Sequence, residues 1–305
     1  MPGPIIRVEK LTKQYGNLVA VDDLSFQVKQ GEIFGMVGPN GAGKTTTIEC
    51  IEGLREADSG TIHLNGLHPI RDHQQVVKQI GIQLQEAALP SRLRVGEAMD
   101  LFASLYDAPA DTYQLLEILG LDEKQNDAFG KLSGGQKQRL FIALSLVNQP
   151  QIVFFDELTT GLDPQARRAM WDLVRSIRDQ GVTVFLTTHF MEEAEQLCDR
   201  VLIIDHGRLV ALDTPEALIE SLGMDKRLIF TLPEGATVEN LKAIPQVEEV
   251  DRSGNRLVVY GGGERFASAV IACLEDQELD FLDLRTQQPN LEDVFLALTG
   301  REIRE

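Results

Sequence analysis

A glycine-rich segment between a strand-like run and a helix-like run constrains this chain more than any other feature. Residues 38–45 read Gly-Pro-Asn-Gly-Ala-Gly-Lys-Thr and fit the pattern G-x-x-x-x-G-K-[ST]. They follow the apolar run 33–37 and precede Thr46, Thr47 and Ile48, which is the strand, loop and helix context that a phosphate-binding loop needs. Glycines let backbone N–H groups turn inward around a phosphate, and the following helix directs its positive end at it. The segment predicts an α/β P-loop NTPase fold.

The side chains of this loop have separate predicted roles. Lys44 is expected to neutralise the outer phosphates of ATP, and the Thr45 hydroxyl is expected to hold Mg²⁺. An ordinary glycine-rich turn is the alternative interpretation of the same letters. The other residues of the predicted nucleotide-binding loop are Gly38, Pro39, Asn40, Gly41, Ala42, Gly43 and Thr46.

Two consecutive carboxylates follow the apolar run 152–155. Asp156 is expected at the carboxyl end of a strand beside the phosphate loop, where it would orient Mg²⁺. Glu157 comes one residue later and is expected to polarise the attacking water as a general base. The alternative is a solvated pair of acids at a strand end, and the phosphate loop upstream favours the catalytic interpretation.

A histidine ends another apolar run. His189 follows residues 184–188, so it is expected at the same sheet edge as the carboxylates. Imidazole nitrogens hydrogen-bond readily to phosphate oxygens, although a lone histidine at a strand end is usually structural or exposed. Beside the other two motifs, His189 is predicted to contact the γ-phosphate.

Composition and charge limit the classes of function. The net charge of −18 over 305 residues opposes binding to nucleic acid and to anionic membrane surfaces. Cys50, Cys198 and Cys273 are widely spaced, which disfavours zinc and disulfides and suits a reducing cytoplasm. No apolar run reaches about 18 residues and no leader-like segment precedes residue 5. Any membrane role is therefore expected to come through a partner.

The order of sequence patterns predicts two domains. Residues 1–222 are expected to form an ATPase domain, with early strand-like runs, a helical insertion at about 90–145 and a parallel α/β region from Gln151 onward. Residues 223–305 are expected to form a small α+β domain, because strands and helices follow one another in the order of the ferredoxin-like split βαβ. The expected strands lie at 5–8, 24–28, 33–37, 61–64, 152–155, 182–186, 201–204, 227–231, 248–251, 256–260 and 281–285, and the expected helices lie at 165–178, 238–243 and 264–275.

A second glycine motif, Leu132-Ser133-Gly134-Gly135-Gln136, gives the chain a specific resemblance. From about Ile5 to Leu222 the chain resembles the nucleotide-binding subunits of ATP-binding cassette (ABC) transporters, whose signature sequence this is. One departure is visible, since Leu158 follows Glu157 where the family usually has proline. The resemblance assigns Tyr15 to stacking on adenine, Gln85 to the magnesium-sensing loop, Asp163 to the dimer-contact loop and His189 to the switch histidine.

The resemblance also implies a partner for each site. In this family, ATP on the phosphate loop of one subunit is capped by the signature residues of another, here Ser133, Gly134, Gly135 and Gln136. The chain has one set of motifs and no internal repeat, so a second copy is the simplest partner. A transmembrane permease, docked near Gln85 and the helical insertion, is the other implied partner, which would hold the chain peripherally at the cytoplasmic face of the membrane.

The last part of the chain favours export. Residues 291–302 are similar to the tail of ABC exporter subunits of the drug-resistance and sodium-efflux type. An importer subunit remains an alternative. So does a soluble ABC ATPase acting on nucleic acid or ribosomes, although the chain lacks the long coiled coil or second cassette of those classes. The expected activity is hydrolysis of ATP with Mg²⁺, coupled to transport.

Overall fold

The computed structural model describes residues 3–83, 88–222, 226–233, 235–236, 238–263 and 265–300. The chain divides into two compact units, one ending at Pro215 and the other beginning at Glu216. Helix α8 (Pro215–Ser221) lies at this division. The expected domain boundary after Leu222 stays a prediction.

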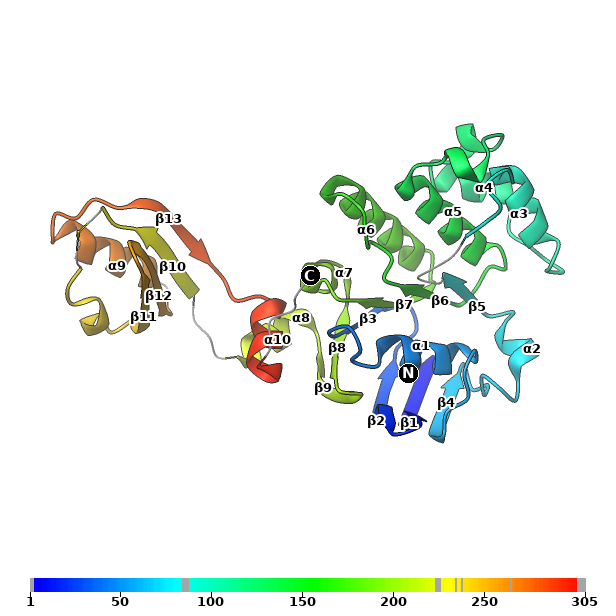
Figure 1. Cartoon of the computed structure of the whole chain (residues 1–305), viewed down its shortest axis with the longest axis horizontal. Coiled ribbons are helices and arrows are strands. Elements are labelled where there is room, and N and C mark those ends of the chain that lie inside the picture. The colour runs from blue at the N-terminus through cyan, green and yellow to red at the C-terminus, as the bar shows by residue number, and fades with distance from the viewer. Residues whose placement is uncertain are drawn as a thin grey trace. The chain divides into compact units, whose positions relative to one another are not determined.

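A six-stranded sheet forms the centre of the first unit (Figure 1). Its order is β5-β6-β7-β3-β8-β9, and every neighbouring pair is parallel except β8 and β9. Every residue of β3, β6 and β7 is buried, as expected for strands covered on both faces. The carboxyl ends of these three neighbours therefore meet at one edge. The strands are β3 (Ile33–Val37), β5 (Ile80–Gln83), β6 (Ile152–Asp156), β7 (Thr183–Thr188), β8 (Arg200–Asp205) and β9 (Arg208–Asp213).

An antiparallel sheet in the order β2-β1-β4 packs on the same core. Helix α1 (Lys44–Glu52) lies between the two sheets (Figure 1), and the Phe26 and Phe34 rings stack 5.5 Å apart. Strands β1 and β2 run well beyond their expected spans, because they form a long hairpin whose outer residues are largely solvent-exposed and break the apolar pattern. The strands are β1 (Ile6–Tyr15), β2 (Leu18–Val28) and β4 (Ser59–Leu64).

Helices occupy most of the segment expected to be a helical insertion. Asp111 caps α4 by accepting hydrogen bonds from two backbone N–H groups, and Ser133 caps α5. Side-chain caps of this kind satisfy donors that a helix start leaves unpaired. These helices are α3 (Val95–Ala103), α4 (Thr112–Ile118) and α5 (Gly134–Leu146), with 3₁₀ turns η1 (Asp122–Lys124) and η2 (Phe129–Lys131). The short helix α2 (His73–Val76) lies before this segment.

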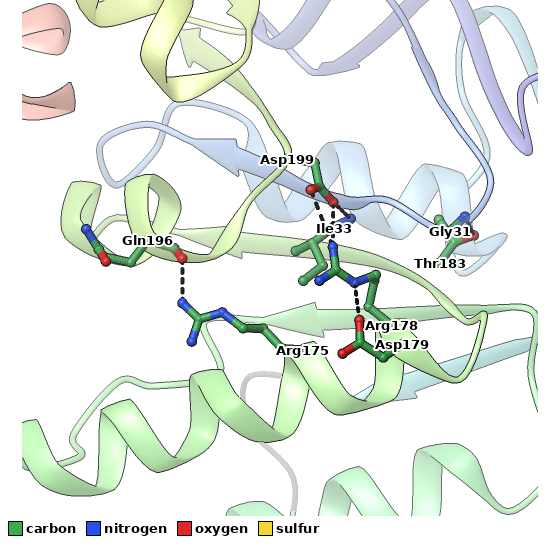
Figure 2. Close-up of polar contacts among 8 residues, drawn as sticks. All are labelled: Gly31, Ile33, Arg175, Arg178, Asp179, Thr183, Gln196 and Asp199. Atoms are coloured by element: carbon green, nitrogen blue, oxygen red, sulfur yellow. Dashed lines mark hydrogen bonds and ion pairs between the residues drawn. The ribbon is translucent and has the colours of Figure 1, made fainter.

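Helices α6 (Pro164–Asp179) and α7 (Met191–Leu197) cover the opposite face of the six-stranded sheet from α1 (Figure 1). The span of α6 confirms the helix expected at 165–178. Figure 2 shows how α6 is fixed: Arg178 lies 3.4 Å from Asp199, whose carboxylate accepts the Ile33 N–H. Arg175 donates to the backbone oxygen of Gln196 at 2.6 Å. Two arginines thus join α6 to the sheet and to α7.

The second unit contains an antiparallel sheet in the order β11-β12-β10-β13. This order and pairing match the predicted split βαβ. The first expected helix is reduced to the 3₁₀ turn η3 (Leu241–Ala243), because Asn240 is left-handed at φ 63° and Pro245 follows, and both disfavour a continuing helix. The other elements are β10 (Lys226–Thr231), β11 (Val247–Ser253), β12 (Arg256–Gly261), α9 (Phe266–Glu275), β13 (Leu282–Gln287) and α10 (Leu291–Thr299).

Candidate active site

A cavity of about 370 Å³ opens at the start of α1. It lies where β3 ends, so the phosphate loop forms one wall and the β1–β2 hairpin forms another. Residues from three separate predicted motifs meet there. The predicted site residues that line it are Tyr15, Asn40, Gly41, Gly43, Lys44, Thr45, Thr46 and Glu157.

Close backbone approach explains two glycines of the loop. A Cβ on Gly43 would lie 2.4 Å from the Ala20 oxygen, and φ at Gly43 is +106°. A Cβ on Gly38 would lie 2.3 Å from the Ile204 oxygen. Both positions therefore exclude any side chain, and the loop passes between the hairpin and strand β8 with its backbone exposed to the cavity.

Lys44 is held inside the loop. Its side chain is 5% exposed, and Nζ donates to the backbone oxygens of Gly38 at 2.8 Å and Pro39 at 3.2 Å. Burial lowers the pKa of the Lys44 ammonium, whereas the Glu157 and Asp156 carboxylates oppose that shift. A phosphate oxygen at this point would relieve the cost of burying the positive charge.

Asp156 ends β6 and is buried beside β7. The Thr187 hydroxyl donates to its Oδ1, and burial raises the pKa of the Asp156 carboxyl. The Thr45 hydroxyl and this carboxylate are hard oxygen donors, which fit Mg²⁺. Among the described residues no group of three or more His, Cys, Asp or Glu side chains could hold a metal. Magnesium in nucleotide sites usually takes one or two carboxylates together with substrate phosphates as ligands.

Glu157 adopts a left-handed backbone conformation, with φ at 51°. Its N–H donates to the Thr187 oxygen at 3.1 Å, which fixes the turn at the end of the strand. Such a conformation costs a non-glycine residue on the order of 1 kcal/mol or more and is common at active sites. This backbone conformation directs the carboxylate toward the cavity, where Oε1 lies 4.0 Å from Lys44 Nζ.

His189 follows β7, as predicted, and is near Glu157 without a formed hydrogen bond. His189 Nδ1 lies 3.3 Å from Glu157 Oε1, but this buried nitrogen has no partner that meets hydrogen-bond geometry. The centroid of the Phe190 ring lies 4.1 Å from the centroid of the imidazole ring. The structure thus brings His189 within reach of the predicted general base, although His189 is not among the residues that line the cavity.

The signature motif lies at the start of α5 and does not line the cavity. Ser133 Oγ accepts the Gln136 N–H, and Gln136 Oε1 accepts the Ser133 N–H at 2.9 Å, a reciprocal capping box. Neither Gly134 nor Gly135 has a left-handed φ, and a Cβ on Gly134 would meet nothing within 4 Å. The fold of this chain therefore gives no reason for glycine at position 134.

The loop after Glu157 connects to the signature helix. Gln138 Nε2 of α5 donates to the Leu158 oxygen at 2.6 Å, and the Leu158 side chain is buried. Further along, the Asp163 carboxylate caps α6 by accepting the N–H groups of Gln165 and Ala166. Asp163 thus has a structural role within the chain. Gln85 lies outside the described residues.

The sequence patterns missed part of the cavity wall. The Gly207 N–H donates to the Ala42 oxygen at 2.9 Å, and its oxygen accepts the Asp22 N–H, so the turn after β8 supports the phosphate loop. No motif marks this turn, although its His-Gly pair after an apolar strand is a turn signal. The additional lining residues are Leu18, Val19, Ala20, His206 and Gly207.

Comparisons with known proteins agree with this geometry. The ABC transporter family matches residues 21–160. The chain is 40% identical to the Nod factor export ATP-binding protein I of Ralstonia nicotianae, over 99% of the chain and 96% of that protein. It is 35% identical to the linearmycin resistance ATP-binding protein LnrL of Bacillus subtilis, over 99% of the chain and 100% of that protein. A solved ATP-binding subunit of an ABC transporter, 27% identical, superposes with a TM-score of 0.65 over 78% of this chain and 98% of its own.

Within the described residues, no helix has both the length and the apolar character needed to span a bilayer. The family assignment is supported by the α/β core, the phosphate loop, the carboxylates after β6 and the full-length relatives. This chain belongs to the ABC transporter family and is the ATP-binding, ATP-hydrolysing subunit of a transporter.

Proposed function

We propose that two copies of this chain close face to face around two ATP molecules, and that hydrolysis reopens them to drive export through a separate transmembrane permease. The observation that carries this proposal is the position of the signature motif. Ser133 and the two glycines are away from the cavity of their own chain, and Gly134 has open space before it. Backbone N–H groups at this helix start suit the γ-phosphate of a nucleotide held by another copy.

Within each proposed site, the residues divide the chemistry. Lys44 neutralises the outer phosphates, and Tyr15 stacks on adenine. Thr45, Asp156 and Gln85 hold Mg²⁺, which neutralises charge on the phosphates when bound. Glu157 accepts a proton from the attacking water. The remaining proposed contacts are those of the loop residues Gly38, Pro39, Asn40, Gly41, Ala42, Gly43 and Thr46, the signature residues Ser133, Gly134, Gly135 and Gln136, the dimer-contact residue Asp163 and the γ-phosphate contact His189.

Export is supported by the full-length relatives. One is named for Nod factor export and another for linearmycin resistance, and the chain spans nearly all of both. Because a transported molecule is selected by the groups that line its pathway, this subunit does not define the substrate. The permease would hold this ATP-binding subunit at the cytoplasmic face of the membrane.

Purification of the tagged chain from detergent-solubilised membranes of its native cell tests the proposal. The expected result is a polytopic membrane protein that co-purifies with the wild type and with Glu157→Gln, and whose transport in inside-out vesicles requires ATP and an intact Glu157. Because accumulation within such vesicles reports export, ATP-dependent loss of substrate from them would indicate an importer. Recovery only with ribosomes or nucleic acid would overturn the transport function.

A further inference from the structure

A buried carboxylate with no part in the phosphate chemistry lies in the helix after His189. Glu193 belongs to α7 and is 2% exposed. The indole N–H of Trp171, in α6, donates to Glu193 Oε1 at 3.1 Å. Burying an ionisable carboxyl is costly unless donors satisfy it. The contacts that satisfy Glu193 therefore constrain which segments must stay together.

Two threonines of the active-site loops lie beside Glu193. Thr188 directly precedes His189, and Thr159 lies two residues after Glu157. Burial raises the pKa of the Glu193 carboxyl, while the nearby Thr188, Thr159 and Trp171 groups oppose the rise. The Trp171 contact meets hydrogen-bond geometry, whereas the buried Thr159 Oγ1 has no hydrogen-bond partner among the described residues. One carboxyl thus lies beside the switch-histidine strand and the loop after the general base.

Helices α6 and α7 are joined at a second level. Arg175, one helical turn after Trp171, donates to the Gln196 oxygen at 2.6 Å (Figure 2). A buried contact and a backbone contact on one side of α6 favour movement of the two helices as a pair. Helix α6 starts at the Asp163 cap, and α7 starts two residues after His189. Both loops are therefore attached to the same helix pair.

We propose that Glu193 is a positioning residue that couples the His189 loop to the Asp163 loop, so that contact of the His189 loop with nucleotide changes the position of the Asp163 loop. The inference rests on the proposed shared-site dimer, in which His189 faces the nucleotide and Asp163 faces the second copy. A coupling of this kind needs an element that both ligands bias. The α6–α7 pair, joined by the Trp171–Glu193 and Arg175–Gln196 contacts, is that element.

The chain carries its own reporter for this coupling, because Trp171 is its single tryptophan. Its indole N–H contacts the carboxylate under study, so a change in that contact should alter its emission. In the Glu157→Gln background, which we expect to keep ATP bound, Trp171 fluorescence should change as ATP binds and the dimer forms.

The decisive experiment adds Glu193→Gln to Glu157→Gln and compares it with Glu192→Gln in the same background. Glutamine keeps the size but offers the Trp171 N–H only a neutral amide oxygen, which is a weaker acceptor than a carboxylate. Glu192 is an exposed neighbour on the same helix, and its 4.0 Å ion pair with Arg167 of α6 is of the exposed kind that contributes little. We expect Glu193→Gln to keep monomer ATP affinity within about twofold while raising the ATP concentration needed for dimerisation about tenfold, a usual size for coupling between sites. The ATP-dependent change in Trp171 emission should be lost, and Glu192→Gln should match the parent.

Trp171→Phe gives a second test from the other end of the contact, since phenylalanine keeps an aromatic ring and removes the N–H that donates to Glu193. It should weaken ATP-dependent dimerisation in the same direction, and it serves if Glu193→Gln does not fold. Parent-like dimerisation in both folded variants, with parent-like emission in Glu193→Gln, would overturn the role of Glu193. If Glu157→Gln alone does not dimerise with ATP, the shared-site proposal fails instead, so the two failures are distinguishable.

Discussion

Lys44 Nζ and Glu157 Oε1 face each other across 4.0 Å at the wall of the cavity, one from the start of α1 and the other from the turn after β6. The pair places a phosphate-binding cation beside a proposed general base, with both side chains mostly buried. A γ-phosphate and the water that attacks it fit the chemistry of this pair, since one group stabilises negative charge and the other accepts a proton.

The two members of this pair should fail differently when replaced. Glu157→Gln is expected to keep ATP binding, to lower kcat at least about 100-fold, which is the usual scale for loss of a general base, and to accumulate an ATP-bound dimer. Lys44→Ala is expected to weaken ATP binding itself. Binding titrations with steady-state ATPase assays separate the two. Equal rates for wild type and both variants would contradict the site assignment.

A shared site makes a prediction about mixtures. Ser133→Arg should cripple hydrolysis although Ser133 is away from the cavity of its own chain, because arginine would obstruct the nucleotide held by the partner. Mixing the Ser133→Arg and Glu157→Gln subunits should restore activity, since the mixed dimer combines an intact Glu157 from one copy with an intact Ser133 from the other. Lack of any gain over the separate variants, with mixed dimers shown to form, would argue against the shared site.

Glycine is required at position 43 for two independent reasons, its φ of +106° and the 2.4 Å that would separate a Cβ from the Ala20 oxygen. Gly43→Ala should lower the free energy of unfolding by about 1–3 kcal/mol and should also weaken nucleotide binding. Gly134→Ala, at an open position with an ordinary helical φ, is the matched control for stability. Chemical denaturation measures both, and an unchanged Gly43→Ala midpoint would disagree with this geometry.

A buried glutamate at the carboxyl end of α1, Glu52, should make stability depend on pH. Burial, with Asp156 and Glu49 nearby, raises the pKa of Glu52 to about 8. Because the folded state binds this proton more tightly than the unfolded state, Glu52 favours folding fully below its ordinary pKa of about 4.5. That contribution is lost as the pH rises from about 4.5 toward 8.

Glu52→Gln should therefore flatten the stability profile across that window. At pH 8 the variant should be more stable than the wild type, by on the order of a few kcal/mol. Glu56→Gln is the control, because Glu56 is an exposed glutamate four residues further along the chain. Urea denaturation at several pH values measures the difference, and parallel profiles for wild type and Glu52→Gln would refute the assignment.

The sequence predicted the core strands and the phosphate loop because their patterns are local. Residues 33–37 are apolar throughout and residues 152–156 are apolar up to Asp156, and such continuous apolar runs are typical of strands buried on both faces in an α/β core. The wall formed by Leu18, Val19 and Gly207 was missed, because it depends on the hairpin and the turn after β8 meeting in space. The shortened helix near Leu241 was missed for a local reason, the left-handed Asn240, which apolar spacing does not reveal.

The contacts of the site residues were less predictable than their positions. Glu157 and His189 end the expected strands, but the positive φ of Glu157 and the hydrogen bond between Gln138 and the Leu158 oxygen follow from tertiary packing. Leu158, which stands where the family usually has proline, has a buried side chain, and its oxygen accepts from Gln138. A carbonyl at this position is available with either residue.

The open space before Gly134 has a consequence for how this sequence can change over time. An alanine there has room for its methyl group within the isolated subunit, so the fold of a single copy places no constraint on this position. If two copies share each site as proposed, the constraint on position 134 comes from the second copy. Selection on the motif would then act on the assembled pair and not on the single chain.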